Sequence, residues 1–303
     1  MNTIYIIYNR IKRTIFRIIY VFIELTKLDG IRINSTAKLS CFEKIYSNNF
    51  GDDLNLLFLR EIVYKKLIYY PRSIISHVFK LDNYICIGST IESRSNEKSI
   101  IWGAGMISAD RDFIFPKKIC AVRGKLTRQR FIDKGIDCPQ IYGDPALLLP
   151  LYYYPKNRTK LFELGIIPHY VDKNNKYIQQ MRRNDPSIEI IDVTEYSDWH
   201  LIIDKIISCK YIVSSSLHGL IVSDAYGIPN LWVEFSKNIH GERFKFYDYY
   251  SSINKEKLLP IFIDQYYTKE ELIVKMIDYT SIEFDPVPLI EACPFMLKSP
   301  DNV

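Results

Sequence analysis

Short apolar runs alternate with stretches of helical periodicity along most of this chain, and most of the apolar runs end in glycine, serine or aspartate. These runs predict strands at residues 39–45, 84–87, 100–102, 119–122, 140–142, 164–169, 189–193, 211–213 and 230–232. Strands that alternate with helices are typical of βαβ units and therefore of an α/β fold with parallel sheets. Ligands of open α/β sheets bind at the carboxyl ends of the strands, so the small-residue loops after these strands predict one crevice.

The alternation divides into two sets of elements. Prolines and charged residues replace the periodicity at residues 152–160, as is typical of a domain boundary. We therefore expect an N-terminal amphipathic helix at residues 1–35, a first α/β domain at 36–155 and a second α/β domain at 156–303. No internal repeat or low-complexity segment interrupts this organisation.

The segment 4–28 is rich in Ile, Tyr and Phe, but charged residues interrupt it. Its uncharged run 18–23 is much shorter than the roughly 20 residues of a membrane span, and no cleavage site of a signal peptide follows. Charged residues at helical spacing predict a narrow polar stripe on an apolar helix: Arg10, Arg13, Arg17, Glu24 and Lys27. Two interpretations remain. The helix packs on its own domain or on a second subunit, or it rests as a basic interfacial helix on the anionic inner leaflet of a membrane.

Composition limits the class of protein. With 303 residues, of which 48 % are hydrophobic and 14 % aromatic, the chain can form two cores, which excludes a disordered or collagen-like polymer. Its formal charge of +5 is modest and spread along the chain, which argues against recognition of nucleic acid. The six cysteines lack C-x-x-C spacing and do not pair with the five histidines at zinc spacing. We expect buried thiols, a reducing cytosol and no metal site.

The most informative chemistry lies between residues 211 and 232, where a serine loop leads from a strand into a helix that begins at Leu217. His218 stands on the first turn of this helix, directly after three consecutive serines. First-turn amides lack intrahelical acceptors and carry a partial positive charge, so this end of the helix favours an anion. An imidazole at the same place can move a proton. The segment predicts a site for a substrate that bears a phosphate or a carboxylate.

Five motifs, in their order and spacing, resemble the polysaccharide pyruvyltransferase family over roughly residues 36–255: NFGDDLN at 49–55, IWGAG at 101–105, VRG at 122–124, GDPALLLP at 143–150 and SSSLHGLIVSDAYGIP at 214–229. The resemblance implies two Rossmann-like domains in a GT-B-type arrangement, with donor and acceptor meeting between them. It also implies transfer of pyruvate from phosphoenolpyruvate onto two hydroxyls of one sugar, which forms a cyclic ketal and releases phosphate. The acceptor would be a bacterial capsule or exopolysaccharide, or its lipid-linked precursor.

This chemistry needs a proton donor for the donor's methylene carbon, a base for the hydroxyls and cations for the anionic groups, but no metal and no cofactor. We assign proton transfer to His218, and we expect Asp52 and Asp53 to orient the acceptor hydroxyls or to act as their base. Arg123, at a strand–helix junction, is the predicted clamp for phosphoenolpyruvate, and Arg243 is a second candidate clamp. The other predicted substrate contacts are Gly51, Asn55, Gly103, Gly105, His169, Ser214, Ser215 and Ser216.

Several of these residues also have structural interpretations. His218 can cap its helix, Arg123 can belong to a solvated basic helix, and an aspartate of the first glycine loop can cap the next helix. Asp144, which precedes a proline, fits a turn better than a chemical role. Ser216 departs from the family, because several members carry arginine at this position, so the cation expected there is absent from this chain.

Two other functions fit the same architecture. One is a metal-independent GT-B-type glycosyltransferase, but the helix 217–226 lacks the glutamate pair with which many such enzymes hold a nucleotide donor. The other is a non-catalytic saccharide-binding assembly subunit, against which the presence of His218, Arg123 and the glycine loops argues. We expect a cytoplasmic enzyme, either free or peripheral on the inner face of the membrane, and we leave homo-oligomerisation open.

Overall fold

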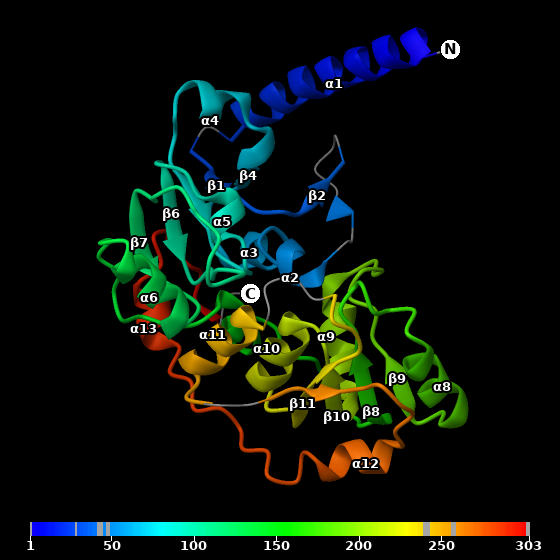
Figure 1. The fold of residues 1–303 in the computed structure, drawn as a ribbon. Helices are drawn as coiled ribbons and strands as arrows, with labels where there is room; N and C mark the ends of the chain where they lie inside the picture. The colour runs from blue at the N-terminus through cyan, green and yellow to red at the C-terminus, as the bar shows by residue number, and fades with distance from the viewer. Residues whose placement is uncertain are drawn as a thin grey trace.

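The first of two parallel sheets contains five of the strands between residues 31 and 121 (Figure 1). The structure is a computed structural model that describes residues 2–27, 29–40, 45–46, 49–238, 243–255 and 259–300. The strands of this sheet are β1 (Ile31–Ile33), β4 (Leu67–Tyr69), β5 (Asn83–Ile85), β6 (Ser99–Trp102) and β7 (Lys118–Ala121), in the order β4-β1-β5-β6-β7. All neighbouring strands run parallel, so the loops that follow them lie along one edge. We call this sheet and its helices the first unit.

The second sheet, with its helices, is the second unit. Its strands are β8 (Phe162–Ile167), β9 (Ile188–Ile190), β10 (Cys209–Ser214), β11 (Asn230–Glu234) and β12 (Ile261–Phe262), in the order β12-β11-β10-β8-β9. These strands are also parallel, and Ser214 at the end of β10 pairs with both Ile167 and Trp232. The serine loop therefore leaves the sheet at the middle of its carboxyl edge.

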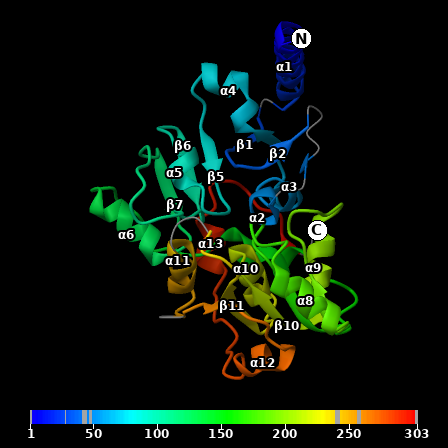
Figure 2. The same ribbon diagram turned by 45° about the vertical axis from the view of Figure 1, so that its right-hand side comes forward.

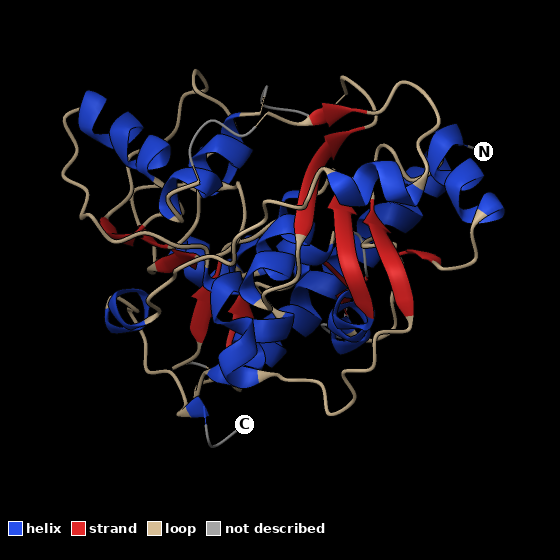
Figure 3. Ribbon diagram, turned by 90° about the horizontal axis from the view of Figure 1, so that it is seen from below, coloured by secondary structure: helices blue, strands red, loops and turns tan. Residues whose placement is uncertain are grey.

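Helices connect the strands and cover the faces of both sheets (Figures 2 and 3). They are α1 (Asn2–Leu25), α2 (Phe50–Asp53), α3 (Leu57–Ile62), α4 (Ile74–Val78), α5 (Ile91–Arg94), α6 (Lys125–Asp133), α7 (Leu149–Tyr152), α8 (Lys176–Asn184), α9 (Trp199–Ser208), α10 (Leu217–Ala225), α11 (Phe244–Ser252), α12 (Lys269–Val274) and α13 (Val287–Glu291), with 3-10 turns η1 (Tyr70–Arg72) and η2 (Pro145–Leu148). The antiparallel hairpin of β2 (Lys38–Leu39) and β3 (Ile45–Tyr46) stands apart from both sheets. One cluster of buried apolar side chains joins the two units, and within it Phe58 packs edge-on against Trp199 at 6.0 Å.

The structure confirms the α/β class with parallel sheets, and most predicted strands lie within a few residues of their predicted positions. The strands β1 and β4 were not predicted, because each has only three residues and charged residues interrupt or precede its apolar pattern. The predicted strand 39–45 is wrong as a single element: its ends belong to β2 and β3, and residues 41–44 lie outside the described residues. The predicted strand 140–142 is reduced to one bridge between Val122 and Tyr142.

The N-terminal helix α1 extends away from the first unit and packs on it near its C-terminal end (Figure 1). Glu24 accepts hydrogen bonds from Ser73 and Ser76 beside α4, and the Tyr20 hydroxyl bonds to the backbone of Tyr69. Seven apolar side chains at helical spacing on α1 are exposed: Tyr5, Tyr8, Ile11, Ile15, Ile18, Phe22 and Leu25. The side chains of Arg10, Arg13 and Arg17 lie outside the described part, so the polar stripe stays a prediction. Over the residues that the structure describes, no helix has the length and apolar character that crossing a membrane requires.

After α12 the chain returns to the first unit. Trp102 Nε1 donates to the carbonyl of Leu289 in α13 at 2.8 Å. Val63 and Leu297 form an antiparallel bridge, and the Lys298 amide donates to the carbonyl of Ile62. The predicted boundaries assigned residues 156–303 to the second domain, whereas these contacts attach the last described part of the chain to the first unit.

Candidate functional site

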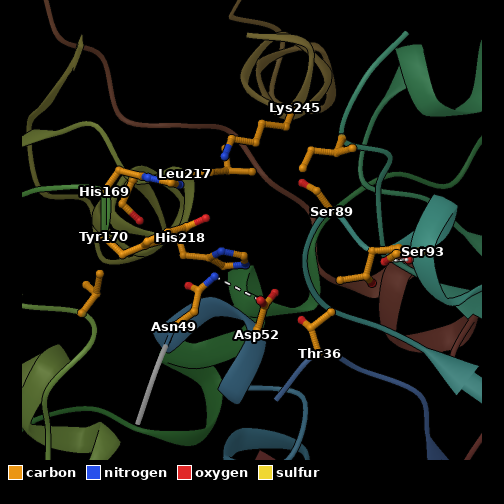
Figure 4. Close-up of a pocket in the computed structure, with 14 residues that line it drawn as sticks. Thr36, Asn49, Asp52, Ser89, Ser93, His169, Tyr170, Leu217, His218 and Lys245 are labelled. Atoms are coloured by element: carbon orange, nitrogen blue, oxygen red, sulfur yellow. Dashed lines mark hydrogen bonds between the residues drawn. The ribbon is translucent and has the colours of Figure 1, made fainter. Parts of the chain in front are cut away.

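A cavity of about 230 Å³ lies between the carboxyl edges of the two sheets (Figure 4). The first unit contributes small polar side chains to its wall: Thr36, Asn49, Asp52, Ser89, Thr90 and Ser93. The second unit contributes two histidines, a lysine and three other side chains: His169, His218, Lys245, Tyr170, Ser216 and Leu217. Four of the predicted site residues are therefore brought together here, namely Asp52, His169, Ser216 and His218.

The three serines before α10 have different places. Ser214 Oγ lies 3.0 Å from the carbonyl of Ile167 and accepts from the Ser216 amide at 3.0 Å. Ser215 Oγ accepts from the His169 amide at 2.8 Å. The side chains of Ser214 and Ser215 are fully buried. They stabilise the loop by hydrogen bonds and do not line the cavity. Ser216 is the N-cap residue of α10 and lines the cavity, but its side chain makes no capping hydrogen bond.

The imidazole of His218 lies against the glycine loops of the first unit. A Cβ atom on Gly51 would lie 1.9 Å from His218 Nδ1, so a glycine is needed at this position. On the other side, the Gly88 amide donates to Asp144 Oδ2 at 3.2 Å, and this oxygen lies 3.7 Å from His218 Nε2. Nε2 is buried and has no hydrogen-bond partner among the described residues. The ring is thus held by its contacts and keeps one nitrogen available for a proton.

The two adjacent aspartates of α2 point in different directions. Asp52 lines the cavity and accepts from Asn49 Nδ2 at 3.0 Å, as Figure 4 shows. Asp53 is fully buried and accepts from the hydroxyl of Tyr196 at 2.6 Å, across the boundary between the units. Burial and the Asp53 carboxylate raise the pKa of Tyr196, so this hydroxyl remains a donor. Asp52 is the one placed for contact with a substrate, and Asp53 joins the two units.

Three other residues predicted to touch substrate pack inside the first unit. Asn55 is buried, donates to the carbonyl of Ile87 at 2.8 Å and accepts from the amide of the same residue at 2.9 Å. Gly103 (φ +83°) leaves room for Pro145, and Gly105 leaves room for the guanidinium of Arg123. These residues shape the strand ends behind the cavity and are not part of its wall.

Arg123 is fully buried and bound by protein groups on every side. Its Nε and Nη2 lie 2.9 and 2.8 Å from Asp248 Oδ2 in α11, and Nη2 also donates to the carbonyl of Met106 at 2.7 Å. Its Nη1 donates to Ser89 Oγ at 2.5 Å, and Ser89 lines the cavity. The guanidinium therefore does not line the cavity itself but contacts a residue that does. Its predicted contact with phosphoenolpyruvate stays a prediction.

The second predicted clamp also has a protein partner. Arg243 forms a bidentate pair with Glu234, with Nε and Nη2 at 2.8 and 2.7 Å from the two carboxylate oxygens. Its side chain is 41 % exposed and does not line the cavity. His169 does line it, beside the ring of Tyr170 at 4.3 Å. Of these two predicted residues, only the histidine is placed to meet a ligand.

Lys245 was not predicted, although it lines the cavity from the first turn of α11. Burial, and to a smaller extent Arg123, lowers the pKa of this ammonium to about 8, while Asp52 acts in the opposite direction. The sequence held one signal for it: a lysine near a helix N-terminus is unfavourable, because this end carries a partial positive charge. Asp144 was interpreted as a turn residue. It does cap η2 by accepting from the Ala146 amide at 3.0 Å, and it also faces His218.

The wall of the cavity contains polar atoms that the protein leaves without partners. The hydroxyls of Thr36 and Thr90 are buried and make no hydrogen bond within the described residues, and His218 Nε2 is in the same position. A buried polar atom without a partner is costly, so three around one cavity indicate a polar ligand or ordered water.

The described cysteines and the possible metal ligands were the remaining candidates for chemistry. Cys86, Cys120, Cys138 and Cys209 are buried and free, as predicted, and burial raises the pKa of the Cys138 and Cys209 thiols to about 12. Within the residues that the structure describes, no group of three or more His, Cys, Asp or Glu side chains could hold a metal ion.

The chain is similar to known proteins over most of the part that builds this cavity. The profile of the family described as polysaccharide pyruvyl transferase matches residues 39–236, in agreement with the resemblance of the five motifs. An uncharacterized protein of Acanthamoeba polyphaga mimivirus is 33% identical over 212 residues, which cover 69% of this chain and 72% of the viral protein. No solved structure matches the chain significantly.

Proposed function

Because the chain belongs to the polysaccharide pyruvyl transferase family, we propose that it transfers pyruvate from phosphoenolpyruvate onto two hydroxyls of one sugar. The sugar would be part of a bacterial surface polysaccharide or of its lipid-linked precursor. The observation that carries the proposal is the position of His218. Its ring packs against the glycine loop at Gly51 of the other unit, its Nε2 has no hydrogen-bond partner among the described residues, and it lines one cavity together with Asp52.

In the proposed reaction, His218 gives a proton to the methylene carbon of phosphoenolpyruvate, which makes C2 electrophilic. A sugar hydroxyl adds to C2 and loses its proton, for which Asp52 is the base that faces the cavity. The C2–O bond to the phosphate breaks with its electron pair on the phosphate. The second hydroxyl then adds to C2, gives its proton to the departing phosphate and closes the ketal, while the proton taken by Asp52 balances the one given by His218. One phosphoenolpyruvate and one diol thus give one ketal and one phosphate, with no oxidation or reduction.

The size and position of the cavity support a small donor. Its volume of about 230 Å³ is below the ~300–1,000 Å³ of pockets for drug-sized ligands, so a three-carbon donor fits it better than a nucleotide sugar. Its place between two parallel sheets supports a GT-B-type arrangement, in which donor and acceptor meet between two Rossmann-like domains. In this arrangement Arg123 acts through Ser89, whose hydroxyl it holds at the wall.

Purified protein incubated with phosphoenolpyruvate and a panel of lipid-linked saccharides is expected to add the mass of pyruvate minus water to one saccharide and to release phosphate. Activity is expected to survive EDTA, because fixed cations and not a metal would hold the anionic groups. Mass spectrometry and a phosphate assay measure both results. Turnover of a nucleotide sugar would instead favour a glycosyltransferase, and absence of turnover with any donor would favour a binding subunit.

We also propose that the enzyme works at the cytoplasmic face of a membrane and that α1 holds it there. The exposed apolar side chains of α1, such as Ile11, Ile15 and Phe22, recur at helical spacing, which fits insertion into the headgroup region. Basic residues on the same helix would add attraction to anionic lipids. This position would bring the cavity near a lipid-linked acceptor.

Deletion of residues 2–17 is expected to abolish binding to anionic liposomes, while Tyr20 and Glu24 keep their contacts with the first unit. Each basic residue near the surface contributes about 1 kcal/mol, a contribution that salt screens. Sedimentation with phosphatidylserine liposomes at low and high salt measures the effect, with phosphatidylcholine liposomes as control. Full-length protein that ignores both kinds of liposome but dissociates from a dimer on this deletion would assign α1 to a subunit interface.

A further inference from the structure

Lys245 is the sole lysine or arginine among the described residues that line the cavity. Its side chain is 8 % exposed, and Figure 4 shows it running from α11 toward Leu217 on the first turn of α10. Among the described residues the ammonium has no hydrogen-bond or ion-pair partner, and its nearest aromatic contact is the Phe246 ring at 5.4 Å. A buried lysine usually has an acidic partner, so its absence here needs an explanation.

Three features of the protein oppose a positive charge at this point. Burial removes the water that would solvate the ammonium, and the Arg123 guanidinium lies behind the wall. The first turn of α11 adds its own partial positive charge. The Asp52 carboxylate offsets only part of these effects, because the pKa of Lys245 still falls to about 8. The free protein therefore holds a cation that it does not neutralise, as a site for an incoming anion requires.

We propose that Lys245 and the first turn of α10 bind the phosphate group of the donor. This inference rests on the proposed function for the identity of the donor, but not for the presence of the anion site. The amides at a helix N-terminus favour a phosphate, and a lysine ammonium serves it as a point charge with three donors. A planar carboxylate would be matched better by an arginine fork, and no arginine lines the described wall.

The placement gives Lys245 a part in the reaction as well as in binding. Phosphate gains charge as its bond to C2 breaks, and a fixed cation beside it stabilises that charge. His218 lies one residue from Leu217 at the same helix end, so the proton donor and the phosphate site share one wall. Loss of the ammonium should therefore lower kcat as well as donor affinity.

Lys245→Met is expected to weaken binding of inorganic phosphate about 10- to 100-fold, the range for loss of one charge-assisted hydrogen bond. Isothermal titration of wild-type protein, Lys245→Met and Lys245→Arg with phosphate and with pyruvate at pH 7 measures this. Pyruvate, which has only the carboxylate, is expected to bind wild type and Lys245→Met alike. Lys134→Met, which removes an exposed lysine at the end of α6, is the matched control and should bind phosphate like wild type.

The pH dependence of phosphate binding provides an independent test of the proposal. The ammonium of Lys245 is charged below about pH 8 and loses its charge above it. Its charged neighbours are Arg123 and Asp52, and the other titratable residues of the same wall are His169 and His218. Phosphate affinity of the wild type, taken relative to that of Lys245→Arg, should therefore fall about tenfold between pH 7 and pH 9. Lys245→Arg is the reference, because its guanidinium stays charged and it meets the same ionisation of the phosphate.

Equal phosphate affinity of wild type and Lys245→Met, or loss of pyruvate binding in place of phosphate binding, would overturn the inference. Lys245→Met removes a buried charge, so it is expected to melt at or above the wild-type temperature, and a scan at pH 7 shows that the variant is folded. The two proposals can fail separately. If phosphate binding depends on Lys245 but no pyruvyl transfer is found, only the proposed function is contradicted. If Lys245→Met transfers pyruvate at the full rate, only the phosphate site is contradicted.

Discussion

Replacement of His218 by alanine or asparagine should lower the rate of pyruvyl transfer about 10²–10⁴-fold, the usual contribution of a positioned proton donor. The expectation rests on His218, which lines the cavity together with Asp52. Its Nε2 has no hydrogen-bond partner among the described residues and lies 3.7 Å from Asp144 Oδ2. Neither substitution adds volume at the contact with Gly51, so both variants should fold. Single-turnover kinetics with phosphoenolpyruvate and the identified acceptor measure the loss.

The matched control is His77→Asn, which changes a histidine of α4 outside the cavity and should retain the wild-type rate. Thermal unfolding of each variant shows whether the fold is kept. Near-normal transfer by a correctly folded His218→Ala would assign the proton to another side chain of the wall, and His169 would be the next to test.

Arg123→Ala is expected to destabilise the protein by about 3–5 kcal/mol, because it leaves the Asp248 carboxylate buried without its partner. The pair joins residues 125 positions apart and ties the start of α6 to α11, where Asp248 also accepts from the Thr127 amide and hydroxyl. Urea denaturation followed by circular dichroism measures the free energy of unfolding. Titration of the folded variant with phosphoenolpyruvate then tests the predicted contact of Arg123 with the donor.

Arg243→Ala is the comparison for this variant. It breaks a bidentate pair with Glu234 whose arginine is 41 % exposed, so the expected cost is about 1 kcal/mol or less. An Arg123→Ala protein as stable as the wild type would show that the buried pair does not hold α6 and α11 together. Wild-type stability of Arg123→Ala combined with weak binding of phosphoenolpyruvate would support the predicted role of Arg123 as the clamp for the donor.

The fold was predictable where apolar runs are long and end in small residues. The run before Gly88 and the run before Gly103 became β5 and β6, and the segment around His218 became β10, α10 and β11. The strand β1 was not predictable in this way. Arg32 stands in its middle, so a charged residue interrupts the short apolar run.

The site was predictable only where local sequence determines it. His218 is placed by its own helix, and Asp52 by the glycine loop beside it. The sequence could not show which of Lys245 and Arg123 lines the cavity. Both are basic residues at helix starts, and only tertiary packing gives them different environments. Asp248 lies far along the chain from Arg123 and takes its charge, whereas no acidic side chain pairs with Lys245 within the described residues. The sequence pattern could not predict which charged residues pair when they lie far apart along the chain.

The return of the chain to the first unit limits how the cavity can open. The two units are joined once between β7 and β8 and a second time between β12 and α13, where Trp102 and Leu289 hold the end of the second connection. Two connections restrict the relative movement of the two units more than one connection would. Any rigid-body movement that admits the proposed acceptor would have to bend both connections at once.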